Sequence, residues 1–267
     1  MQSPQAQTLQ QHIAVIQKAE AFMDSGQQQD QGALMAFENA FRALEEAANG
    51  SSETKNRHDK ESAAAWLAVC HLKGIGCEQD VDKAIEIASP AAGWREPVAM
   101  YALAAAQIQK MIDAVPESGR VPYESNPAAS DLERVWASLS QADVTALENI
   151  KDTLEFSKNQ NVVPAAYLQS QVHFTLRWAK HSTKDFEQAP YVLKGAADAG
   201  YAPAQFNMAQ RFLQDDEITP NDASSAAFYA TKAYRQGYRV EDSTALYNKA
   251  QGVIAASAPQ APVWSTP

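Results

Sequence analysis

The sequence predicts an all-α protein built from helix hairpins. Alanine is abundant, whereas the chain of 267 residues has only 13 prolines and 11 glycines, and it shows no sustained alternation of polar and apolar residues of the kind that strands require. The third observation is the stretch 63–93, AAAWLAVCHLKGIGCEQDVDKAIEIASPAAG, which holds two helical patterns joined by a Gly-x-Gly turn. A chain of this length can bury a core of ordinary size.

The hairpin in this stretch is defined by two narrow stripes of mostly small residues. They recur at helical spacing on one face of each helix, at Ala63, Leu67, Ala68 and His71 in the first and at Ala84, Ile87, Ala88 and Ala91 in the second. Gly74 and Gly76 supply the permissive backbone of a sharp reversal, and Asp80 is the expected N-cap of the second helix. Small residues on both stripes let the two helices pack closely and antiparallel.

The same stretch resembles the Sel-one-like repeat, a relative of the tetratricopeptide repeat. The family pattern L-G-x-x-Y-x-x-G-x-G-V-x-x-D-x-x-K-A, ending near A-A-x-x-G, is followed over 67–84 and closes at 91–93. The chain departs from it with Ala68 for Gly, His71 for Tyr and Cys77 for Val. The resemblance implies a right-handed α/α solenoid of helix hairpins, to which the rest of the sequence adds an insertion and helical caps.

Helical hairpins are expected on both sides of this stretch. Residues 1–50 hold two helical patterns without repeat signatures, which we expect to form an N-terminal hairpin cap. The repeat solenoid is expected over 61–256, because equivalent alanines lie 36 residues apart in the first two hairpins and 39 apart in the last two. The Pro-rich tail 257–267 is expected to be disordered.

Two segments interrupt the pattern. The polar stretch 50–60 has no apolar face and is expected to be a loop. Near 115–160 the spacing between equivalent alanines grows to 66 residues, which predicts an insertion. Its first part, 115–129, contains three prolines and cannot be helical throughout, and two helices are expected over 130–140 and 141–158. The insertion is either an evolutionary addition at a loop tip or a docking loop for a partner.

The charge balance limits the classes of partner. Lys and Arg total 22 against 32 Asp and Glu, a formal net charge of −10, which argues against binding the nucleic-acid backbone. The charge fits either a basic protein partner or simple solubility. No apolar run reaches 18 residues, so we expect no membrane insertion. The N-terminal residues do not resemble a secretory signal, which predicts a cytoplasmic protein unless an upstream signal has been removed.

The two cysteines, Cys70 and Cys77, allow two interpretations. They are either small hydrophobic side chains in the core or a disulfide, which the resemblance implies because some secreted members of the family are cysteine-bridged. A metal site would need more ligands than the neighbouring His71. We therefore expect no metal and no cofactor.

The sequence offers no catalytic residue. The five histidines belong to no metalloprotease, nucleophile-elbow or Ser-His-Asp pattern, and the Gly-x-Gly turn is not a phosphate-binding loop. His71 and His173 fall near the position that the family gives to Tyr, so we interpret them as packing residues. The chain is therefore predicted not to be an enzyme. A hydrolase is the alternative from another class, since a few family members have been assigned such activity.

A candidate binding surface remains. In helix-hairpin solenoids the first helix of each hairpin lines the concave side, and Tyr101, Tyr167 and Phe206 recur at equivalent positions in three of them. Gln171 and Gln210 follow four residues later in two hairpins. By analogy with tetratricopeptide geometry, these positions face a groove that suits an apolar peptide or helix. Alternatively, the same aromatics pack between adjacent repeats.

We therefore interpret the chain as a non-enzymatic protein–protein interaction module. It would act as a scaffold, adaptor or inhibitor that binds a partner protein or peptide in its concave groove. A specialised version is an immunity or antagonist protein that neutralises a toxin or enzyme. The sequence does not identify the partner.

Overall fold

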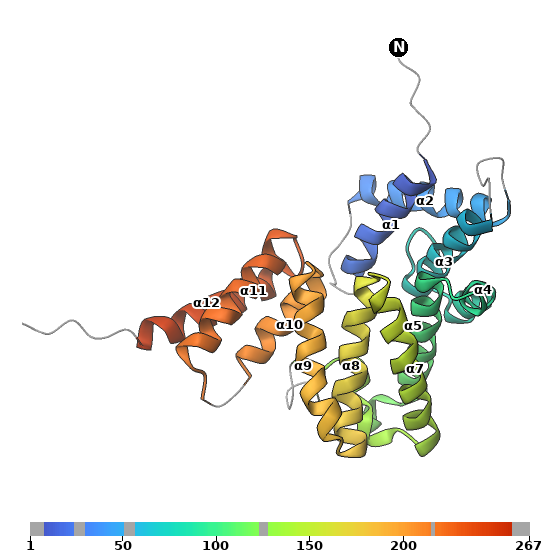
Figure 1. The fold of residues 1–267 in the computed structure, drawn as a ribbon. Helices are drawn as coiled ribbons and strands as arrows, with labels where there is room; N and C mark the ends of the chain where they lie inside the picture. Colours follow the sequence, from blue (N-terminus) through green and yellow to red (C-terminus); the bar gives the residue numbers. More distant parts are fainter. Residues whose placement is uncertain (1–7, 24–29, 51–56, 123–127, 215–216, 258–267) are drawn as a thin grey trace, which may run out of the picture.

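The computed structural model describes residues 8–23, 30–50, 57–122, 128–214 and 217–257. Within these ranges the chain forms twelve α-helices and no strand. Successive helices pack as hairpins that follow one another in a curved array (Figure 1). The prediction of an all-α solenoid is therefore confirmed.

The first two helices form a hairpin that covers α3. α1 (Leu9–Met23) and α2 (Gln31–Ala48) pack against each other and against α3 (Arg57–Lys73). Asp30 caps α2, because its carboxylate accepts a hydrogen bond of 2.7 Å from the backbone N–H of Ala33. We propose that this hairpin shields the open end of the stack.

α3 begins earlier than the sequence indicates. Residues 57–60, which we expected to be part of a loop, form the first turn of this helix; residues 51–56 of the expected loop lie outside the described ranges. Arg57 pairs with Glu61 one turn later at 2.5 Å, and Asp59 lies in the first turn, where a negative charge suits the helix dipole. Charge placement therefore extends a helix whose first turn has no apolar face.

The turn between α3 and α4 (Val81–Gly93) has the predicted geometry. Gly74 and Gly76 have φ angles of +69° and +72°, a region that side chains other than glycine disfavour. Asp80 caps α4 by accepting a 2.9 Å hydrogen bond from the N–H of Lys83. A Cβ atom on Gly76 would lie 2.5 Å from the carbonyl oxygen of Phe37 in α2. The turn therefore also packs against α2 of the first hairpin.

The insertion separates a first helix from its partner. α5 (Pro97–Asp113) packs against α7 (Gln141–Asn159), and α7 packs in turn on α8, as the second helix of a hairpin does. The expected helix over 130–140 is wrong: the segment holds only the four-residue α6 (Asp131–Arg134) and the 3-10 turn η3 (Trp136–Ser138). A further 3-10 turn, η1 (Glu117–Gly119), precedes them. A capping box at Ser130 starts α6, and a second one at Ser140 starts α7.

The C-terminal half is regular. Its helices are α8 (Val163–Lys180), α9 (Thr183–Asp198), α10 (Ala202–Phe212), α11 (Pro220–Arg235) and α12 (Val240–Ser257). Each packs against the next along the chain. Residues 258–267 of the predicted disordered tail lie outside the described ranges.

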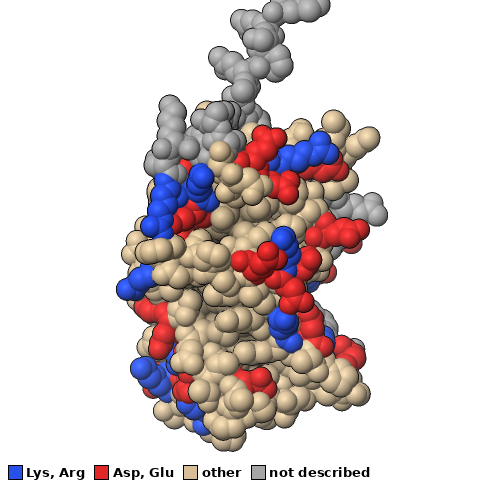
Figure 2. Space-filling model, turned by 90° about the vertical axis from the view of Figure 1, so that its right-hand side faces the viewer, with Lys and Arg blue, Asp and Glu red and all other residues tan. Residues whose placement is uncertain are grey.

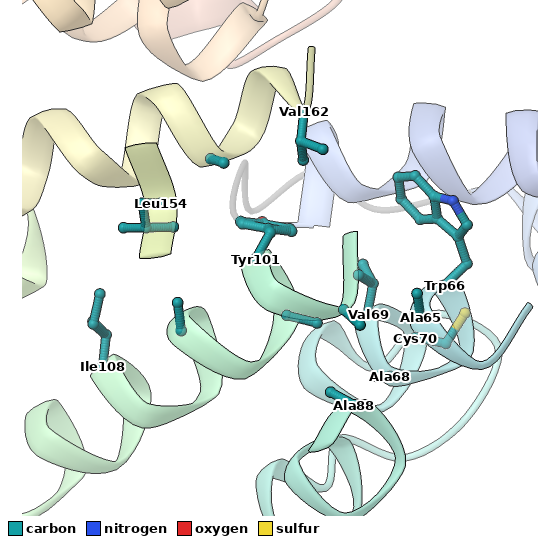
Figure 3. Close-up of a cluster of buried hydrophobic side chains, with 14 of the residues drawn as sticks. Ala65, Trp66, Ala68, Val69, Cys70, Ala88, Tyr101, Ile108, Leu154 and Val162 are labelled. Carbon is teal, nitrogen blue, oxygen red and sulfur yellow. The ribbon is translucent and has the colours of Figure 1, made fainter. Parts of the chain in front are cut away.

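Alanine forms much of the core. Fully buried alanines face one another across successive helices, for example at Ala68 in α3, Ala88 in α4 and Ala102 in α5. Figure 3 shows this region, with Ala65, Ala68, Val69 and Cys70 along α3 and Ala88 on α4. None of the described helices combines the length and apolarity that crossing a membrane requires.

Gly76→Ala is expected to destabilise the protein more than Gly200→Ala. Both positions have positive φ, so each substitution costs about 1–2 kcal/mol of backbone strain. Only the Cβ at position 76 meets a backbone, at Phe37, whereas the Cβ at position 200 has nothing within 4 Å. The overlap adds about 1–3 kcal/mol. Chemical denaturation of the two variants checks this, and equal losses would show that the turn does not contact α2 as described.

Candidate functional site

A groove with a volume of ≈ 480 Å³ lies between the first helices of four successive hairpins, α3, α5, α8 and α10. Amide side chains are frequent in its lining, at Gln79, Gln109, Gln171, Asn207 and Gln210. Tyrosines line it as well, at Tyr101, Tyr167, Tyr201 and Tyr238. The register predicted from the repeat spacing therefore brings residues far apart in the sequence to one surface.

All five predicted groove residues line this site, with different exposure. Tyr101 and Phe206 are only 3% and 6% exposed, whereas Tyr167, Gln171 and Gln210 are half-buried. The sequence allowed either residues that face a groove or aromatics that pack between repeats, and the five residues divide between the two. Tyr101 and Phe206 are packed into the wall, whereas Tyr167, Gln171 and Gln210 have part of their surface exposed.

A buried carboxylate, Glu20 of α1, also lines the groove. Its Oε1 accepts a 2.6 Å hydrogen bond from the Tyr101 hydroxyl. The Tyr201 hydroxyl lies 3.1 and 3.0 Å from its two carboxylate oxygens. Sequence reasoning missed Glu20, although it lies seven residues after the buried Ile13, on the apolar stripe of α1. An acidic residue on such a stripe is the signal that could have found it.

The aromatic side chains of the groove contact one another in pairs. The rings of Tyr167 and Tyr201 have centroids 5.4 Å apart, and Phe206 meets Tyr238 edge-on at 5.7 Å. Tyr201 therefore connects the partly exposed Tyr167 to the buried carboxylate of Glu20. These contacts hold the ring of Tyr167 in a defined position before any ligand binds.

The insertion forms a further wall of the groove through residues 129–132. It is fastened to α10, where Asn207 donates a 2.9 Å hydrogen bond to the carbonyl of Ala128. Arg211 donates to both carboxylate oxygens of the buried Glu133, at 2.9 and 2.7 Å. The part of the insertion that the structure describes therefore packs into the fold and shapes the groove.

The cysteines and His71 form part of the core. Cys70 is buried, Cys77 is half-buried, and both thiols are free rather than bridged. Burial, together with the charges of Asp80 and Glu45, raises the pKa of Cys77 to about 11, so this thiol is protonated at neutral pH. The ring of His71 packs edge-on against Phe41 at 5.4 Å, as expected of an aromatic-like packing residue.

His173 differs from this expectation. Its Nδ1 lies 2.6 Å from Oδ1 of Asp185 in α9, and Lys151 Nζ of α7 approaches the same oxygen at 3.2 Å. Burial lowers the pKa of His173 although Asp185 opposes the shift. Burial opposes ionisation of Asp185 as well, but hydrogen bonds from Ser182 and His173 and the charge of Lys151 hold its pKa below the usual value.

The His173–Asp185 pair contains two of the three groups of a hydrolase triad. Among the described residues, however, no hydroxyl or thiol donates a hydrogen bond to His173. Nor does any group of three or more His, Cys, Asp and Glu within the described ranges have a geometry suited to a metal ion. Together with Lys151, the pair connects α7, α8 and α9, which is a structural role.

Acidic and basic side chains are interspersed on the face that Figure 2 shows, and neither sign of charge dominates it. In the groove itself, Glu20 and Asp131 occur together with Lys73 and Arg239. Hydrogen-bonding groups rather than one sign of charge thus characterise the groove. Glutamine and asparagine each carry a donor and an acceptor, the combination that pairs with a peptide backbone.

Comparison with known proteins identifies repeats in two places. Residues 61–92 and 202–238 match the Sel1 repeat family. The first match covers most of α3 and α4, and the second covers α10 and α11. Among solved structures, a Sel1 repeat protein from Oxalobacter formigenes is 16% identical, with 94% of this chain and 84% of that chain covered and a TM-score of 0.27. No curated protein matches the chain significantly.

The buried histidine predicts a pH-dependent stability. Because the pKa of His173 lies below its ordinary value of 6.5, the folded state binds fewer protons than the unfolded state in this range. The contribution of neutral His173 to the free energy of unfolding is fully present above about pH 6.5. It is lost as the pH falls through the lowered pKa of this residue. We therefore expect that His173→Gln flattens the slope of unfolding free energy against pH below about pH 6.5.

The matched control is His58→Gln, which changes an exposed histidine in the first turn of α3. Urea unfolding at several pH values measures the slope for both variants and the unmodified chain. An unchanged slope in His173→Gln would contradict the assignment.

Proposed function

Because the chain contains Sel1 repeats, we propose that it is a non-enzymatic scaffold, adaptor or inhibitor that binds a segment of a partner protein in the groove. Sel1 repeat proteins are generally protein-interaction modules. The observation that carries the proposal is the convergence of Tyr167, Gln171 and Gln210 on one groove, with part of each side chain exposed.

The lining favours an extended peptide over a helix. The N–H and C=O groups of a bound α-helix bond within the helix, so the partly exposed groove amides, Gln171 among them, would meet only its side chains. An extended segment presents backbone donors and acceptors at regular intervals, which glutamine and asparagine can pair with. The partly exposed ring of Tyr167 would contact an apolar side chain of the same segment.

The groove volume also restricts the occupant. A volume of ≈ 480 Å³ is within the range of small-molecule pockets, about 300–1,000 Å³. Residues 129–132 and Glu20 bound the groove, so a few residues of the partner would enter it and the rest would contact its rim. An antagonist that neutralises a toxin or enzyme would use the same site. That the partner is basic and that the protein is cytoplasmic stay predictions from the sequence.

Tyr167→Ala is expected to weaken partner binding without unfolding the chain. The first step is affinity capture from the native host, followed by identification and purification of the bound protein. Aromatic anchors at interfaces contribute about 2 kcal/mol or more on truncation, so affinity should fall about thirtyfold or more. Calorimetry measures the affinity, and the melting temperature shows whether the variant is folded. Gln171→Ala is expected to weaken binding as well.

Tyr191→Ala is the matched control, since Tyr191 on α9 is 75% exposed and lies outside the groove. It should leave the affinity unchanged. If folded Tyr167→Ala and Gln171→Ala bind as the unmodified chain does, the groove is not the binding site. If Tyr191→Ala weakens binding instead, the partner contacts the outer face of α9.

A further inference from the structure

A second candidate site lies at the end of α8, where Arg177 is stacked between aromatic rings. Its guanidinium carbon lies 4.5 Å from the ring centroid of Trp178 and 4.1 Å from that of Phe186. The two rings are 39% and 49% exposed. Trp136 of the insertion extends the aromatic surface, with its ring 6.3 Å from that of Trp178. Such stacking fixes the plane of the guanidinium while its edge stays available for hydrogen bonds.

No hydrogen-bond acceptor within the described ranges pairs with this guanidinium: its contacts there are with the two rings. A guanidinium carries five N–H donors in a planar fork that matches a carboxylate. Arg177 is half-buried, and none of its side-chain nitrogens is among the described polar atoms that are buried without a partner, so the donors reach solvent and are accessible to a ligand. The arrangement is therefore suited to an anionic ligand.

A second arginine adds positive charge to the site. Arg211 of α10 stands 3.5 Å over the ring of Phe174, and Phe174 lies one helical turn before Arg177 on α8. Burial and the charge of Arg211 lower the pKa of Arg177, whereas the charge of Glu133 opposes the shift. Arg211 is itself paired with the carboxylate of Glu133.

These charges define the class of ligand. Arg211 is already paired with Glu133, so the guanidinium of Arg177 is the cation left for a ligand, and a single carboxylate matches its one charge. The exposed rings of Trp178 and Phe186 flank the cation and would contact an apolar neighbour. We propose that Arg177 binds the carboxylate of an acidic side chain in a partner peptide, beside an apolar residue packed on these rings. The site lies outside the lining of the groove and does not depend on the groove's function.

The test uses the full chain and three capped tetrapeptides that differ at one position: acetyl-Gly-Leu-Glu-Gly-amide and its glutamine and phosphoserine counterparts. Titration is followed by NMR of the Nε–H group of Arg177, assigned by comparison with Arg177→Gln. We expect the glutamate peptide to shift this signal and to bind about tenfold more tightly than the glutamine peptide, the effect of one hydrogen bond to a charged group. Arg177→Gln should abolish the difference.

Arg235→Gln is the matched control, because it removes the same charge from an exposed position in the last turn of α11 and should leave the preference intact. Equal binding of the glutamate and glutamine peptides by the unmodified chain would overturn the proposal whether or not the variants fold. A preference that persists in folded Arg177→Gln would overturn it too. Tighter binding of the phosphoserine peptide would show that the ligand is a phosphate and that the carboxylate assignment is wrong.

Discussion

Close contact between alanine-lined helices is the constraint on which the rest of the structure depends. Ala63, Ala84, Ala99, Ala165 and Ala204 are all fully buried where helices meet. Each short side chain buries little apolar surface and contributes little to stability on its own. It does, however, let the helix backbones approach until the larger side chains around it interlock. The spacing of the first helices is set in this way. That spacing is why equivalent positions on α5, α8 and α10 line one groove.

The regular part of the fold could be predicted because its signals are local. The glycine turn at 74–76, the Asp80 cap and the small-residue stripes each act within one hairpin, so a single stretch of sequence contains the full instruction. The start of α3 and the segment 130–140 were predicted wrongly for the converse reason. A charged first turn forms a helix without an apolar face. Capping boxes at Ser130 and Ser140 start two separate helices, whereas periodicity does not show that α6 ends at Arg134.

The residues that line the groove also fall into two groups, those that the sequence predicts and those that it does not. Tyr167, Gln171 and Gln210 follow from repeat spacing, since a solenoid presents equivalent positions to the same side. Glu20 and residues 129–132 reach the groove only through tertiary packing, which periodicity does not report. The hydrogen bond between His173 and Asp185 crosses from α8 to α9. The family's tyrosine position therefore predicts that the His173 ring lies in the core, but it does not predict that Asp185 is its partner.

The contact of Glu20 with Tyr201 joins residues 181 positions apart, and Arg211 and Glu133 are 78 positions apart. In a simple repeat array each unit touches only its neighbours, so end units can open independently and folding can start anywhere. These two cross-links tie α10 to α1 and to the insertion, so the hairpin that begins with α10 cannot separate from the array without exposing a buried carboxylate. Unfolding consequently becomes more cooperative, and folding slows because long chain segments must close before the links form.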